Sequence, residues 1–139
     1  MYKEKKGGKV MDFLKAYVVS FLIFLVVDAV WLTLVAPKFY KSQIGHLMSD
    51  SPNLIAALIF YLIFIVGIVY FVLLPSLETH DFTKLIISAI LFGFITYATY
   101  DLTNLATLKD WPIKVTIVDL IWGTSLSSIV SILSYLILK

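Results

Sequence analysis

Long apolar runs alternate with short polar segments along the whole chain. Because an α-helix rises about 1.5 Å per residue, roughly 20 apolar residues cross a hydrocarbon core about 30 Å thick. Pro37 and Pro75 close the first two runs, and Pro112 stands in a turn-like segment before the fourth. We therefore predict an all-α fold, an integral membrane four-helix bundle, with spans at residues 13–36, 54–74, 84–108 and 115–138.

The composition supports the membrane assignment. Hydrophobic residues make up 60% of the 139 residues, only 14% are charged, and the mean hydropathy is +0.97. Soluble domains carry about a quarter charged residues, so the expected partner of this surface is the lipid bilayer. The chain has no cysteine, which excludes disulfides and thiolate chemistry. It also lacks an extended basic face, so no nucleic-acid partner is expected.

Residues 1–10 differ from the rest because four of them are lysine. We interpret them as an N-terminal extension, either disordered or foreign to the native chain, and residues 11–139 as a single domain. The first run is longer than the apolar part of a signal peptide and contains Asp28, so we expect it to be retained. Seven lysines on the side of the termini, against four on the other, favour cytoplasmic termini. Without residues 1–10 the count is three against four, so this orientation depends on the extension being native.

Three carboxylates fall within the predicted spans. From the nearest span ends, helix geometry places Asp28 about 12 Å, Asp101 about 10 Å and Asp119 about 6 Å inside the membrane. All three distances are measured from the side opposite the termini, so the carboxylates occupy the same half of the bilayer. An unpaired aspartate at the bilayer centre costs roughly 2.5–3.5 kcal/mol, and such residues normally face the bundle interior. The sequence therefore predicts an acidic pocket between the helices.

Aromatic and amide side chains accompany these carboxylates. One helical stripe of the third span carries Gly93, Tyr97, Tyr100, Asp101 and Asn104. The segments around Asp28 and Asp119 share the pattern V-D-x-x-W-x-T, which indicates either inverted symmetry or chance. The predicted ligand-binding residues are Asp28, Trp31, Tyr97, Tyr100, Asp101, Asn104, Asp119 and Trp122.

Tyr40, His46 and Lys109 are predicted to contribute from the segments outside the membrane on the same side as the carboxylates. His46 is interpreted as an ordinary loop histidine in preference to a metal ligand, and no metal site is predicted.

At these residues the chain resembles a bacterial family of four-span membrane proteins known as domain of unknown function 2177. The resemblance implies the same fold and a multi-pass location in the bacterial inner membrane, and it carries no activity or cofactor. The segments that carry it are 28–32 (DAVWL), 39–40 (FY), 45–47 (GHL), 52–53 (PN), 97–107 (YATYDLTNLAT), 111–112 (WP) and 118–123 (VDLIWG).

Three functions fit these features. The first is binding or transport of a small cationic or amphiphilic ligand, and a transporter of only four spans would act as a homo-oligomer. The second is a membrane enzyme acting on a lipid or isoprenoid, with an aspartate as general acid or base. The third is a structural or assembly subunit in which the polar residues only join helices. We favour the first.

Overall fold

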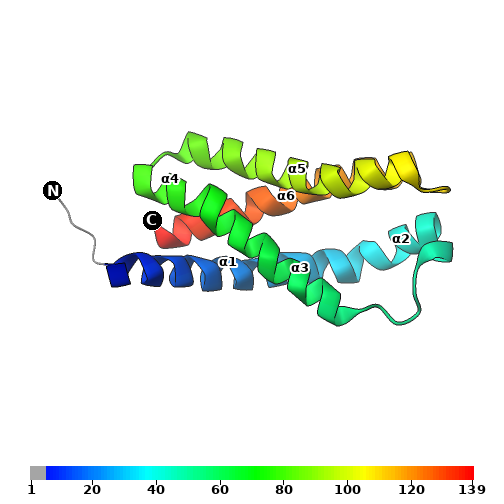
Figure 1. Ribbon diagram of the computed structural model, residues 1–139, viewed down its shortest axis with the longest axis horizontal. Helices are drawn as coiled ribbons and strands as arrows, with labels where there is room; N and C mark the ends of the chain where they lie inside the picture. Colours follow the sequence, from blue (N-terminus) through cyan, green and yellow to red (C-terminus); the bar gives the residue numbers. More distant parts are fainter. Residues whose placement is uncertain (1–5) are drawn as a thin grey trace.

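The structure, a computed structural model, describes residues 6–139, with side chains from residue 8 onward (Figure 1). In this part of the chain four helical stretches are long and apolar enough to cross a membrane. The predicted all-α membrane bundle is confirmed. Its elements are α1 (Lys6–Leu34), α2 (Ala36–Ile44), the 3-10 turn η1 (Gly45–Leu47), α3 (Leu54–Gly67), the π-helical η2 (Ile68–Leu73), α4 (Leu74–Thr79), α5 (Phe82–Thr107) and α6 (Ile113–Leu138).

The predicted N-terminal extension falls partly on described residues. Residues 1–5 lie outside them, whereas residues 6–10 form the start of α1. The beginning of α1 and the C-terminal end of α6 lie at the same end of the bundle, and α2 lies at the other (Figure 1). This arrangement follows from an even number of spans.

The segment 37–53, expected to be a loop, is partly helical. The first helix breaks at Val35, and Pro37 lies in the first turn of α2. Proline suits this position because the backbone N–H that it lacks has no partner in a first helical turn. Pro37 therefore lies at the start of a short helix that continues beyond α1 at this end of the bundle (Figure 1).

The second span passes Pro75 instead of ending there. It begins as expected at Asn53, whose side chain caps α3 by accepting a hydrogen bond from the Ala56 N–H at 3.1 Å. In η2 the backbone hydrogen bonds join residues that are five apart in sequence instead of four. One of them runs from the Leu74 N–H to the Val69 carbonyl. This wider turn provides room for the proline ring, which would clash with the carbonyl four residues earlier in a regular helix.

Helices α5 and α6 form the most extensive packing of the bundle. A Cβ atom on Gly93 would overlap the carbonyl oxygen of Gly123, so the two backbones touch at these glycines. Further along, the Ser127 hydroxyl donates to the Ala89 carbonyl at 2.8 Å. Small residues are the usual means by which membrane helices approach closely. This contact fixes the rotation of α5 against α6, and with it the direction of their polar side chains.

The other helices cover this pair unequally. Helix α1 packs along α6, and η2 is buried against α1, α5 and α6. Helix α3 contacts α1 and η2, and it meets α5 through the ring of Phe64, which packs against Phe92 and Tyr97. In Figure 1, α3 slants across the bundle and moves away from α5 toward the end that holds α2. Most outward-facing side chains are large and apolar, as expected for a multi-pass protein in contact with lipid.

Candidate functional site

Three helices each bring one buried aspartate to the half of the bundle next to α2. Asp28 of α1 and Asp119 of α6 are 6% exposed, and Asp101 of α5 is fully buried. On α5, Asp101 continues the stripe that packs against α6, two helical turns beyond Gly93. The close α5–α6 contact therefore directs this carboxylate inward, away from lipid.

Asp101 and Asp119 form an adjacent pair. Their carboxyl groups are close enough to interact, although within the described residues neither oxygen of Asp101 has a hydrogen-bond partner of good geometry. A buried polar group without a partner costs about 1–3 kcal/mol, and more when it is charged. Asp101 is therefore the least satisfied polar group of this cluster.

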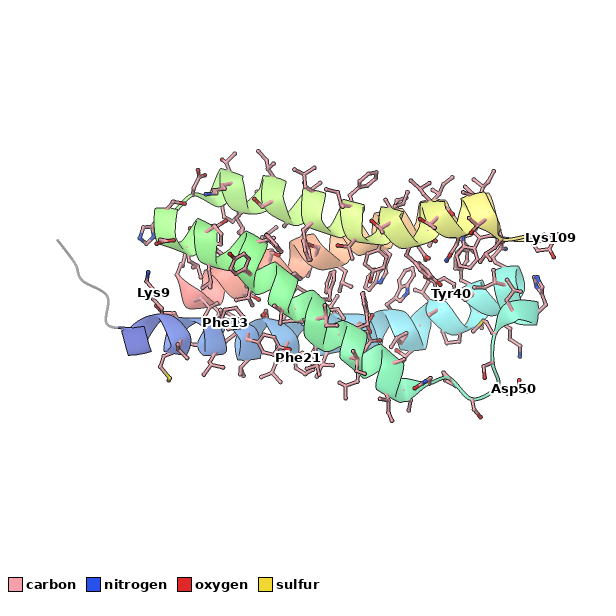
Figure 2. The ribbon with its side chains drawn as sticks, in the orientation of Figure 1. Lys9, Phe13, Phe21, Tyr40, Asp50 and Lys109 are labelled. Carbon is pink, nitrogen blue, oxygen red and sulfur yellow. The ribbon has the colours of Figure 1, made fainter. Side chains whose placement is uncertain are left out.

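Tyr40 completes the pair from outside the membrane spans. It lies on α2, at the end of the bundle where α5 and α6 are joined (Figure 2), and its hydroxyl donates a hydrogen bond to Asp119 Oδ1. Burial, reinforced by the neighbouring Asp119 carboxylate, raises the pKa of the Tyr40 phenol above its usual value. The phenol thus stays protonated and keeps its role as donor. The structure thus brings Tyr40, one of the residues predicted to contribute from outside the spans, to Asp119.

Asp28 lies deeper in the membrane than the pair. The rings of Trp31 and Trp122 stack with centroids 4.3 Å apart and planes inclined by 8°. Each tryptophan follows its aspartate by three residues, or about 4.5 Å along the helix. Because α1 and α6 run antiparallel, Asp28 and Asp119 lie on opposite sides of the stacked rings, about 9 Å apart along the helix axes.

Tyr97 occupies the space between the deeper and the shallower carboxylates. Its phenol lies close enough to Asp28, Asp119 and Asp101 to interact with all three. A Cβ on Gly123 would overlap its ring, so the absence of a side chain at this position makes room for the tyrosine. The ring of Tyr97 thus joins the carboxylates into one polar and aromatic cluster.

A short polar chain holds the backbone at Asp101. The Trp111 indole N–H donates to Thr116 Oγ1 at 3.2 Å, and the Thr116 hydroxyl donates to the Asp101 carbonyl at 3.4 Å. Tyr100 meets the Trp111 ring edge-on, with centroids 5.8 Å apart. Tyr100 also interacts with Asn104 and, electrostatically, with Asp101. The predicted residues Tyr100 and Asn104 therefore border the cluster and do not form its centre.

The structure does not bring His46 and Lys109 to the carboxylates. His46 Nε2 lies 3.9 Å from Asp110 Oδ2, and both side chains are mostly exposed. Lys109 is exposed beyond the end of α5, at the tip of the bundle (Figure 2). The His46–Asp110 contact joins η1 to the turn between α5 and α6, which is a structural role for that histidine.

The three carboxylates have no basic partner among the residues that the structure describes. Within the part of the chain that the structure describes, no lysine or histidine forms an ion pair with Asp28, Asp101 or Asp119. The same residues contain no group of three or more metal-ligating side chains close enough to hold one ion. The cluster consists of acidic groups, two of them paired, beside aromatic rings.

Sequence reasoning missed Tyr61 and Thr116. The Tyr61 hydroxyl of α3 interacts with the Asp28 carboxylate, and Thr116 supports the backbone of Asp101. A detectable signal existed for Tyr61, because it carries one of the few polar groups of a span that is otherwise apolar. Thr116 gave no comparable signal, since threonines are frequent along this chain.

Comparison with known proteins agrees with the resemblance seen in the sequence. A family model described as "Predicted membrane protein (DUF2177)" matches residues 13–136, a range that includes every residue of the predicted site. Searches of curated proteins and of solved structures gave no match.

Proposed function

We propose that the chain, which belongs to the DUF2177 family of predicted membrane proteins, binds a small organic cation at the buried carboxylates Asp28, Asp101 and Asp119. One observation carries this proposal. The carboxylate of Asp101 is fully buried beside Asp119, and its oxygens have no hydrogen-bond partner among the described residues.

The electrostatics of the pair favours a positive ligand. Removing a carboxylate from water costs several kcal/mol unless an opposite charge or several hydrogen bonds compensate. Asp119 has Tyr40 as a donor and Asp28 has Tyr61, whereas among the described residues Asp101 has neither a donor nor an ion pair with a basic side chain. A cation beside Asp101 would offset the cost for both carboxylates of the pair.

The aromatic lining favours an organic cation over a metal ion. Trp31 and Trp122 stack between the carboxylates, and Tyr97 lies beside all three. A quaternary ammonium group gains about 0.5–2 kcal/mol from each well-placed ring face, and more when water is excluded. Its charge is spread over methyl groups, so it needs no close set of oxygen ligands. Such a cation is therefore compatible with carboxylates that are spaced apart along the helix axes.

Location and orientation are part of the proposal. We place the protein in the inner membrane of a bacterium with both termini in the cytoplasm, on the basis of the lysine distribution. The chain has no cysteine, so single substitutions can be labelled without background. In intact cells, a membrane-impermeant maleimide is expected to label Asp50→Cys and not Lys139→Cys; the reverse pattern would invert the topology.

The binding test uses purified protein in nanodiscs of zwitterionic lipid. Choline and its uncharged isostere, in which carbon replaces the nitrogen, are titrated and tryptophan fluorescence is recorded, because the Trp31–Trp122 stack lies beside the proposed site. Choline is expected to bind and the isostere is not. The attraction between two unit charges about 4 Å apart is about 4 kcal/mol at an effective dielectric constant of about 20, so Asp101→Asn, which removes one charge, should weaken choline binding at least about tenfold.

A matched control separates a specific site from general surface charge. Asp50 lies in the exposed segment on the same side of the membrane, so Asp50→Asn makes the same chemical change outside the pocket. We expect this variant to bind choline as the unaltered protein does. Equal binding of choline and its isostere, or equal effects of the two substitutions, would refute the cation site and favour a purely structural role for the carboxylates.

A further inference from the structure

A groove of about 290 Å³ opens on the side of the bundle, between α3 and α5. Its walls are Phe60 of α3 and Thr96, Tyr97 and Tyr100 of α5. The α5 residues lie seven to eleven positions before the end of that helix at Thr107, or about 10–16 Å inside the membrane. At that depth the groove opens toward acyl chains and not toward water.

The groove has an apolar lining. The Thr96 hydroxyl donates to the Phe92 carbonyl of its own helix at 2.6 Å, so its hydrogen-bonding capacity is already used. Three of the four lining side chains are aromatic rings. Such a surface offers contacts to hydrocarbon and few hydrogen bonds to a polar group.

Two residues of the groove lie next to the carboxylates. Tyr97 lines the groove and also lies close to Asp28, Asp101 and Asp119. Tyr100 lines it and interacts electrostatically with the Asp101–Asp119 pair. The apolar groove and the acidic cluster therefore have these two tyrosines in common.

The divergence of α3 from α5 gives this opening its place. Near the C-terminal end of α3 the Phe64 ring packs against Phe92 and Tyr97 of α5, and from there α3 diverges from α5 toward the end that holds α2 (Figure 1). The side chains of Phe60 and Tyr100 are 41% and 56% exposed across this gap. A chain could enter here from the bilayer without unpacking the α5–α6 contact.

We infer that the ligand is a single-chain cationic amphiphile, whose charged head lies at the Asp101–Asp119 pair and whose hydrocarbon chain lies in the groove between α3 and α5. Charge complementarity at the head, and the two tyrosines that border both the groove and the carboxylates, identify this occupant. The inference rests on the proposed cation site and adds the class of ligand and its entry from the membrane.

The test is a series of alkyltrimethylammonium ions with ethyl, hexyl and decyl chains, titrated into the protein in nanodiscs. Affinities are referred to the free aqueous concentration, and empty nanodiscs correct for partitioning. Burial of one methylene is worth about a fourfold gain in affinity, so affinity should rise steeply along the series. Binding of the head alone, with the chain left in water, would give no such rise.

Two neighbouring threonines provide a matched pair of variants. Thr96 lines the groove, whereas Thr99 is exposed outside it, and each hydroxyl bonds the carbonyl four residues earlier. Thr96→Trp should abolish most of the increase in affinity with alkyl chain length and keep the affinity for the ethyl probe. Thr99→Trp should change neither quantity. If Thr96→Trp fails to fold, Phe60→Ala removes a wall of the groove and should reduce the same gain.

The outcomes separate this inference from the proposed function. If the ethyl probe binds normally and affinity rises equally with chain length in both tryptophan variants, the hydrocarbon chain does not lie in the groove. That result would leave the cation site intact. Failure of the ethyl probe to bind the unaltered protein would overturn the cation site and this inference together.

Discussion

Replacement of Asp101 by asparagine should make the unliganded protein more stable while it weakens cation binding. The substitution keeps the size and shape of the side chain and removes its charge. In the structure this carboxylate is fully buried, and within the described residues its oxygens lack hydrogen-bond partners. A residue that stabilised the bundle would show the opposite change in stability.

The magnitude follows from the local contacts. A buried, unpaired polar group costs about 1–3 kcal/mol. The asparagine amide can donate to the neighbouring carboxylate of Asp119, which converts an unfavourable pair into a hydrogen-bonded one. Because the amide leaves one oxygen of its own unpaired, we expect a net gain of about 1–2 kcal/mol in the free energy of unfolding.

The assay is reversible unfolding in mixed micelles, driven by a denaturing detergent and followed by tryptophan fluorescence. Asp50→Asn, in an exposed segment, serves as the control and should stay within about 0.5 kcal/mol of the unaltered protein. A loss of 1 kcal/mol or more in Asp101→Asn, with no change in the control, would refute the reasoning. It would show that Asp101 is satisfied by contacts that hold the helices together.

Three further outcomes test other parts of the structure in the same unfolding assay. Gly123→Ala should lower the free energy of unfolding by about 1–3 kcal/mol, because its new methyl group overlaps a tyrosine ring. The methyl group of Gly8→Ala meets nothing within 4 Å, so this variant should be neutral. Equal effects of the two substitutions would disprove the close α5–α6 contact. Tyr40→Phe should lower stability by about 1–2 kcal/mol through loss of its hydrogen bond to Asp119, and an unchanged value would remove α2 from the site. His46→Gln breaks an exposed contact and should shift stability by less than about 0.5 kcal/mol without altering choline affinity; a loss of affinity would return this histidine to the site.

The spans were predictable because membrane thickness fixes their length. The predicted fourth span, residues 115–138, and the observed α6, Ile113–Leu138, differ by two residues at the start and none at the end. The short helix α2 was not predicted, because Pro37 was interpreted as the end of a helix when it lies in the first turn of the next. A proline alone does not distinguish these two positions.

The depth of the site residues in the membrane could be predicted from the sequence, but only some of their contacts could. Helix rise alone placed Asp28, Asp101 and Asp119 in one half of the membrane. Adjacency of Asp101 to Asp119 depends on the rotation of α5 against α6, which the Gly93–Gly123 contact sets, and no local pattern encodes that rotation. The stack of Trp31 on Trp122, which lies between Asp28 and Asp119, could not be foreseen either, since it depends on how α1 packs against α6.

The most direct measurement is an experimental structure of the protein in complex with tetramethylarsonium, a quaternary cation whose arsenic atom scatters X-rays anomalously. Our account predicts one anomalous peak between the Asp101–Asp119 pair and the Trp31–Trp122 rings, within about 6 Å of a ring centroid. An empty pocket in crystals that hold the cation elsewhere, or a peak only on the exposed acidic segments, would contradict it.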